Sequence, residues 1–228
     1  MAPSQPHQPP PAHTFEQWVA WVFDHPVTKP EWHWTDRTPR PTRAQSLSYL
    51  IELFEAPEGL LQTYSDAQLN QGLWFLTSNS CSEHFYAFTD PGLPEHQRLR
   101  GVRAIGTLYT HLFAKRCSPH LSHLDEAGRT SLNSVCYMLW DIAPLPRFHD
   151  HAAFAAVNLA AIDVMEACLA LDHDACRESA LHGLGECHWF VPVRPRIHAA
   201  IDTFLARSPH LRPELAAYAK HARAGHVL

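Results

Sequence analysis

The chain has 228 residues, of which 46% are hydrophobic and 18% are charged, a composition typical of globular proteins and not of disordered ones. The formal net charge of −5 and the lack of any Lys/Arg block argue against nucleic-acid binding. The most apolar stretch, residues 152–171, is interrupted by Asn158, Asp163 and Glu166, which argues against a membrane span.

Histidine is unusually frequent, with 18 residues in the chain. Protonation of all of them would change the formal net charge from −5 to +13. Free imidazole titrates near pH 6.5, so charge repulsion should grow steeply around that pH. We therefore expect mild acid to destabilise or expand the protein.

The context of the six cysteines indicates a protein of a reducing compartment. The N-terminal residues contain no apolar signal segment, and the chain is not a small loop-rich scaffold of the kind that disulfides hold together. We expect unpaired, mostly buried thiols and a cytoplasmic location. The six residues are Cys81, Cys117, Cys136, Cys168, Cys176 and Cys187.

Residues 1–13 form the first segment and contain five prolines, a composition that favours an extended, solvated tail. Residues 14–228 are expected to form a single all-helical domain. Its first helix begins at the capping-box pattern Thr14–Gln17 and ends before Pro26. The aromatic stretch 29–41 that follows is expected to be an ordered loop.

Apolar residues three or four apart then recur, separated by Pro and Gly. Pro57 and Gly59 are expected to end the first of these helices, and Asn158 and Glu166 are expected to face water. No hairpin turn or sustained alternating pattern predicts a strand. The pattern predicts helices over 42–55, 65–79, 82–88, 99–113, 125–141, 150–171 and 174–189, with two more around 197–205 and 215–218.

The segment 176–185, Cys-Arg-Glu-Ser-Ala-Leu-His-Gly-Leu-Gly, resembles a helix of HEAT-like repeats, and the resemblance lies mainly within residues 150–207. The small residues Ala180, Gly183 and Gly185 should let a neighbouring helix approach closely. The resemblance implies antiparallel helical hairpins stacked as an α-solenoid. An irregular helical bundle is the alternative, because the upstream helices carry no clear copy of the motif.

Two groups of residues are candidates for a metal site. Cys117, His120 and His123 combine thiolate and imidazole, the ligand types that zinc prefers, in one short segment. The run from His149 to His151 resembles the His-Asp doublet of metal-dependent phosphohydrolases. No cofactor is expected at either place, zinc being the candidate if one is bound. Helix or loop capping is the competing role for both groups.

Glu178 and His182 lie one helical turn apart, so the carboxylate could orient the imidazole for acid/base chemistry. An ordinary surface pair or a buried polar network would show the same spacing. The sequence therefore marks the two as candidate catalytic residues without favouring that role.

The tryptophans are candidates for a partner-binding surface, because Trp dominates the energetics of many protein interfaces. Trp32, Trp34, Trp74 and Trp189 are the candidate binding surface. The first hypothesis is accordingly a non-catalytic, HEAT-like adaptor that binds another protein. The alternatives are a metal-dependent hydrolase or other metalloprotein, and a pH-sensitive binder of a peptide or small ligand.

Overall fold

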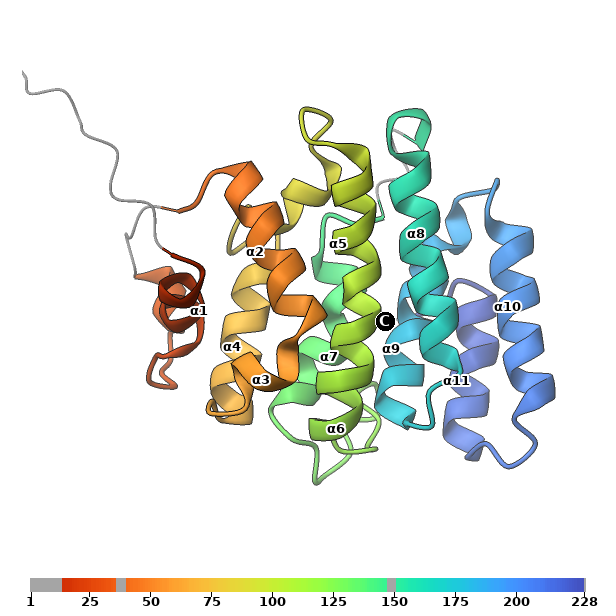
Figure 1. The fold of residues 1–228 in the computed structure, drawn as a ribbon. Coiled ribbons are helices and arrows are strands. Elements are labelled where there is room, and N and C mark those ends of the chain that lie inside the picture. Colours follow the sequence, from red (N-terminus) through yellow and green to blue (C-terminus); the bar gives the residue numbers. More distant parts are fainter. Residues whose placement is uncertain (1–13, 36–39, 147–150, 228) are drawn as a thin grey trace, which may run out of the picture.

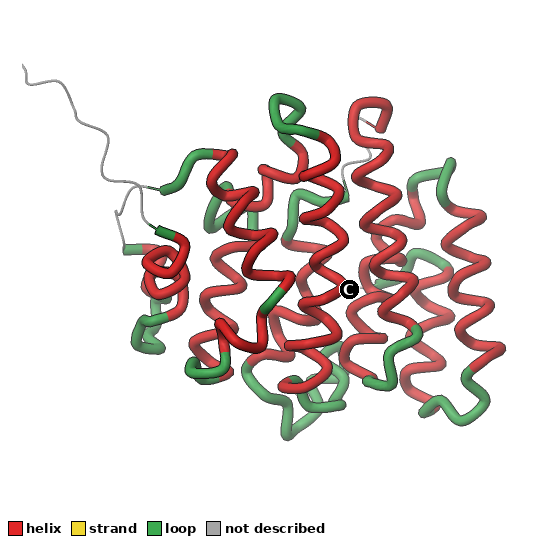
Figure 2. Tube along the Cα trace, viewed as in Figure 1, coloured by secondary structure: helices red, strands yellow, loops and turns green. Residues whose placement is uncertain are grey.

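The protein is all α-helical in a computed structural model that describes residues 14–35, 40–146 and 151–227. These ranges contain no β-strand (Figure 2), so the all-α prediction is confirmed. The predicted tail, residues 1–13, lies outside the described residues. None of the described helices combines the length and apolarity needed to cross a membrane.

Capping boxes begin the first helices. Thr14 Oγ1 accepts a hydrogen bond from Gln17 N (3.3 Å), and Gln17 Oε1 accepts one from Thr14 N (3.0 Å), at the start of α1 (Phe15–Phe23). Equivalent pairs begin α2 (Arg43–Glu55) and α4 (Asp66–Thr77). A short 3₁₀ turn, η1 (Trp32–Trp34), lies between α1 and α2.

Pro57 has a second role besides the one expected. It ends α2 as predicted, but it also starts a further short helix, α3 (Pro57–Leu61), which includes Gly59. Proline is tolerated in a first helical turn because the N–H that it lacks would have no partner there.

The middle of the chain is helical from residue 95 to residue 116. It comprises α5 (Glu95–Leu108), a π-helical turn η3 (Tyr109–Phe113) and the short α6 (Ala114–Arg116), and follows the 3₁₀ turn η2 (His84–Thr89).

The helix predicted from Asp125 begins later, as α7 (Leu132–Ile142). Asp125 and Gly128 have positive φ angles, 52° and 94°, which a right-handed helix cannot include.

Four helices complete the fold: α8 (His151–Leu169), α9 (Asp174–Glu186), α10 (Arg194–Arg207) and α11 (Pro213–Arg223). The 3₁₀ turn η5 (Cys187–Trp189) follows α9. The expectation that Asn158 faces water was wrong, because it is fully buried in α8. This helix packs against both α5 and α9, so more than one of its faces is covered.

The helices lie in two layers (Figure 1). One layer contains α2, α5, α8 and α10, and the other contains α4, α7, α9 and α11, with α1 packed against α4. Short connections make α8 antiparallel to α9 and α10 antiparallel to α11. A continuous core runs from Phe15 to Ala222 between the layers. All six cysteines are unpaired and buried, as expected for reduced thiols.

Candidate functional site

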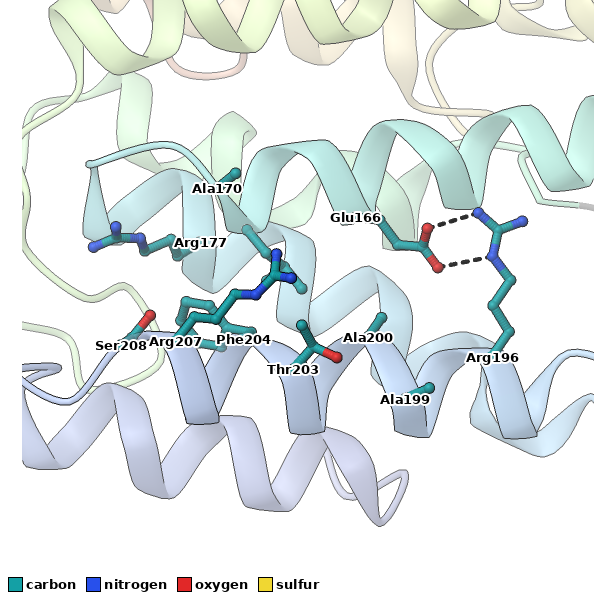
Figure 3. A pocket seen from close by; sticks show the side chains of 11 residues that line it. Glu166, Ala170, Arg177, Arg196, Ala199, Ala200, Thr203, Phe204, Arg207 and Ser208 are labelled. Atoms are coloured by element: carbon teal, nitrogen blue, oxygen red, sulfur yellow. Dashed lines mark hydrogen bonds and ion pairs between the residues drawn. The ribbon is translucent and has the colours of Figure 1, made fainter.

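A cleft of about 610 Å³ opens between α8 and α10. Within their layer, α2 packs closely on α5 and α5 on α8, whereas α8 and α10 make few direct contacts. The cleft lies beside this interruption of the packing. Its lining residues, most of them labelled in Figure 3, are Glu166, Leu169, Ala170, Arg177, Arg196, Ala199, Ala200, Thr203, Phe204, Arg207 and Ser208.

Small side chains leave this space open. Ala170 is the first residue after α8, and Ala199 and Ala200 occupy adjacent positions of α10 (Figure 3). An Ala side chain cannot reach across to a neighbouring helix as Leu or Phe would, so the helices are not drawn together here. Phe204 and Leu169 provide the larger apolar surfaces of the cleft.

An ion-pair bridge joins α8 and α10 at one end of the cleft (Figure 3). Arg196 Nε lies 2.8 Å from Glu166 Oε1, and Arg196 Nη2 lies 2.7 Å from Glu166 Oε2 and 2.5 Å from Asp163 Oδ1. The hydrogen bonds to Glu166 raise the pKa of Arg196 above the usual value of a guanidinium group. A bidentate guanidinium–carboxylate pair has a fixed geometry, so it holds the two helices at a set separation.

The other end of the cleft is basic. Arg177 pairs at 3.3 Å with the exposed Asp172 and at 3.5 Å with Asp174. Arg207 is exposed, and no hydrogen bond or ion pair joins it to another residue in the described ranges. Its guanidinium group extends from α10 into the space between the helices (Figure 3). The cleft therefore offers an uncompensated cation beside an apolar surface.

The predicted catalytic pair occupies a second place, in the interior of the protein. Glu178 is fully buried. Its carboxylate accepts hydrogen bonds from Ser122 N (2.8 Å) and His123 N (2.9 Å), and its Oε1 also lies 2.6 Å from His123 Nδ1. Glu178 thus fastens the 118–131 loop to α9, a structural role for which a buried carboxylate with several donors is well suited.

His182, one turn further along α9, belongs to the same network. Its Nδ1 lies 2.8 Å from the hydroxyl of Tyr218, which is 3.0 Å from the hydroxyl of Tyr137. The ring of Tyr218 stacks on that of His123 at 4.1 Å between centroids. Glu178 and His182 are therefore connected through Tyr218 and His123.

The predicted zinc ligands do not converge in the described part of the chain. The thiol of Cys117 neighbours the buried Cys136, His120 packs against Gly128, and His123 is bonded to Glu178. His149 lies outside the described residues, and the side chain of His151 is likewise not described. Among the described residues, the set that brings three metal-ligating atoms within 4.8 Å of one another is Asp141, His182 and Glu186.

The four predicted surface tryptophans have different environments. Trp32 is buried and stacks on His25, whereas Trp34 is 57% exposed and shares a pocket of about 310 Å³ with the half-buried Trp74. Trp189 is 67% exposed and belongs to the connection between α9 and α10. The structure thus brings Trp34 and Trp74 together in one pocket, and Trp189 is not among the residues that line it.

Sequence reasoning missed the α8–α10 cleft. Its cationic residues are ordinary surface arginines in the sequence, and only the relative placement of two helices makes them neighbours. The i, i+4 spacing of His182 and Glu186 was a readable signal, although it does not identify Asp141 as the third member.

The fold and cleft define an all-α protein built of two helical layers. Comparisons with protein-family models, curated proteins and solved structures found no match for this chain. Functional inference therefore depends on the geometry of the cleft and of the buried network.

Proposed function

We propose that the protein is a HEAT-like helical interaction module that binds a segment of a partner protein in the α8–α10 cleft. The observation that carries the proposal is the cleft itself, about 610 Å³ in volume, with the unpaired Arg207 beside an apolar surface. The stacked helix pairs support it, because repeats of this kind commonly present such surfaces to partners. The proposed arrangement is a short α-solenoid.

The chemistry of the cleft defines the partner segment. Ala199, Ala200 and Phe204 would contact an apolar side chain, and Arg207 would pair with an acidic side chain close to it. Arg196 is already neutralised by Glu166 and Asp163, so it adds little attraction. The expected ligand is therefore a peptide segment with one acidic and at least one bulky apolar residue.

Selection from a random peptide library tests this function. Peptides selected on the wild-type protein should share an acidic and an apolar position. Ala200→Phe fills the cleft and Arg207→Glu reverses its free charge, and each should weaken binding by about tenfold or more. Isothermal titration calorimetry on the selected peptides measures the change.

Matched controls are available on other helices. Ala217→Phe adds the same ring at an exposed position of α11, and Arg103→Glu reverses an exposed charge on α5. Both should bind the selected peptides as the wild type does. Equal binding by Ala200→Phe and the wild type would overturn the proposal.

The other two hypotheses have different support. The cleft does not support the hypothesis of a pH-sensitive binder, because none of the residues that line the cleft is a histidine. A metalloprotein is favoured by one observation elsewhere, the convergence of Asp141, His182 and Glu186.

A further inference from the structure

Two carboxylates and one imidazole meet where α7 and α9 end. Asp141 is the penultimate residue of α7, and Glu186 is the last residue of α9. His182 precedes Glu186 by four residues, so both side chains lie on one face of α9. One ligand atom from each of the three lies within 4.8 Å of the other two.

His182 is held as a metal ligand would be. The residue is 2% exposed, and its Nδ1 is engaged by the Tyr218 hydroxyl at 2.8 Å. Its Nε2 is buried and has no hydrogen-bond partner. Metal-bound histidines usually bind the metal through one nitrogen and a polar group through the other, which fixes the ring. Tyr218 supplies that second contact here.

The surroundings of Asp141 and Glu186 favour a cation. Both carboxylates are exposed, and neither forms an ion pair with a residue in the described ranges. Each is close to a helix C-terminus, where the helix dipole adds negative potential. One oxygen atom of each carboxylate lies within 4.8 Å of the other, so the two negative charges repel each other. A bound cation would relieve this repulsion and give the buried nitrogen a partner.

We propose that Asp141, His182 and Glu186 form a binding site for a divalent first-row transition metal ion such as Mn²⁺ or Zn²⁺. Two carboxylates balance the charge of the ion, and the imidazole favours these metals over Mg²⁺ and Ca²⁺, which prefer all-oxygen sites. Three protein ligands leave at least one coordination position for water. The proposal does not depend on the α8–α10 cleft.

Manganese is the best first probe because it has little affinity for the buried thiols. Tag-free protein is stripped with a chelator and titrated with MnCl₂, and free Mn²⁺ is followed by electron paramagnetic resonance. We expect one ion per chain and a higher melting temperature with Mn²⁺ present. A titration with MgCl₂ should show binding at least about tenfold weaker.

Three variants assign the ion to this site. Asp141→Asn and Glu186→Gln change exposed side chains, so both should fold, and each should weaken Mn²⁺ binding by about tenfold or more. Tyr218→Phe removes the hydroxyl that contacts both His182 and Tyr137, and it should weaken Mn²⁺ binding less than either carboxylate variant. Asp172→Asn, at an exposed carboxylate outside the site, should bind Mn²⁺ as the wild type does.

Absence of Mn²⁺ and Zn²⁺ binding by the wild type would overturn the proposal. So would binding that both Asp141→Asn and Glu186→Gln retain unchanged, since the ion would then lie elsewhere. Circular dichroism of each variant confirms that a loss of binding is not a loss of folding.

Discussion

At the scale of single residues, Glu178 is the carboxylate of the buried network. It joins α9 to the 118–131 loop through two backbone amides and His123, and its side chain has no access to solvent. The candidate catalytic role is therefore less well supported than a structural one, because all of these contacts are internal.

Glu178→Gln should destabilise the protein by about 3 kcal/mol. The amide group of Gln places a donor where the carboxylate accepts, so at least one backbone amide loses its partner, at about 1–3 kcal/mol for each unsatisfied group. Urea denaturation followed by circular dichroism measures the change. Glu52→Gln, at an exposed position of α2, should change the unfolding free energy by less than about 0.5 kcal/mol. Equal stability of the two variants would argue against this role.

At the scale of helices, the glycines of α9 let the neighbouring elements pack closely against it. A Cβ atom at Gly183 would lie 2.6 Å from Met165 Sδ and 2.7 Å from Trp140 Cβ, so α7 and α8 approach α9 at the same point. A Cβ at Gly185 would meet Val227 at 2.6 Å. The expectation that small residues allow close approach is confirmed here.

Gly183→Ala should destabilise the protein by about 1–2 kcal/mol. Overpacking costs about 1–3 kcal/mol, and the better helix propensity of Ala offsets up to about 1 kcal/mol of it. Gly59→Ala in α3 is the matched control, because nothing lies within 4 Å of its new Cβ. That variant should be stabilised by about 0.5–1 kcal/mol. Thermal denaturation of both shows whether the signs differ; a stabilised Gly183→Ala would mean that the helices are not in close contact.

At the scale of the whole molecule, burial of histidines explains the expected sensitivity to acid. Burial lowers the pKa of His33 and His182, and it lowers the pKa of His84 to about 3. As the pH falls through 6.5, these residues bind fewer protons in the folded protein than in the unfolded chain. Unfolding then takes up protons, so stability decreases as the pH falls from 6.5.

His84→Gln should reduce this sensitivity. For His84 the loss amounts to about 1.4 kcal/mol per pH unit between 6.5 and about 3, so the wild type should lose about 2 kcal/mol more than the variant between pH 7 and pH 5. Urea denaturation at both pH values measures the difference. His96→Gln, at an exposed position of α5, should keep the wild-type dependence. A His84→Gln variant as acid-sensitive as the wild type would contradict this explanation.

The presence of most helices could be predicted from the sequence, whereas their exact boundaries and packing could not. A local signal such as the capping box at Thr14 acts within one turn, so it can be read without the fold. The start of α7 and the burial of Asn158 could not be read, because a positive φ at Asp125 and the contacts of α8 with two other helices depend on tertiary packing. The candidate sites were predicted in part. Glu178 and His182 proved to be neighbours in one network, whereas the cleft exists only because α8 and α10 lie apart.

The most direct measurement of the proposed function is the change in backbone amide NMR shifts when a selected acidic and apolar peptide is added to the protein. Binding in the cleft predicts the largest changes at residues 166–177 and 196–208, with smaller changes elsewhere. Changes centred instead on Trp34 and Trp74, or on Asp141 and Glu186, would contradict the assignment of the α8–α10 cleft as the binding site.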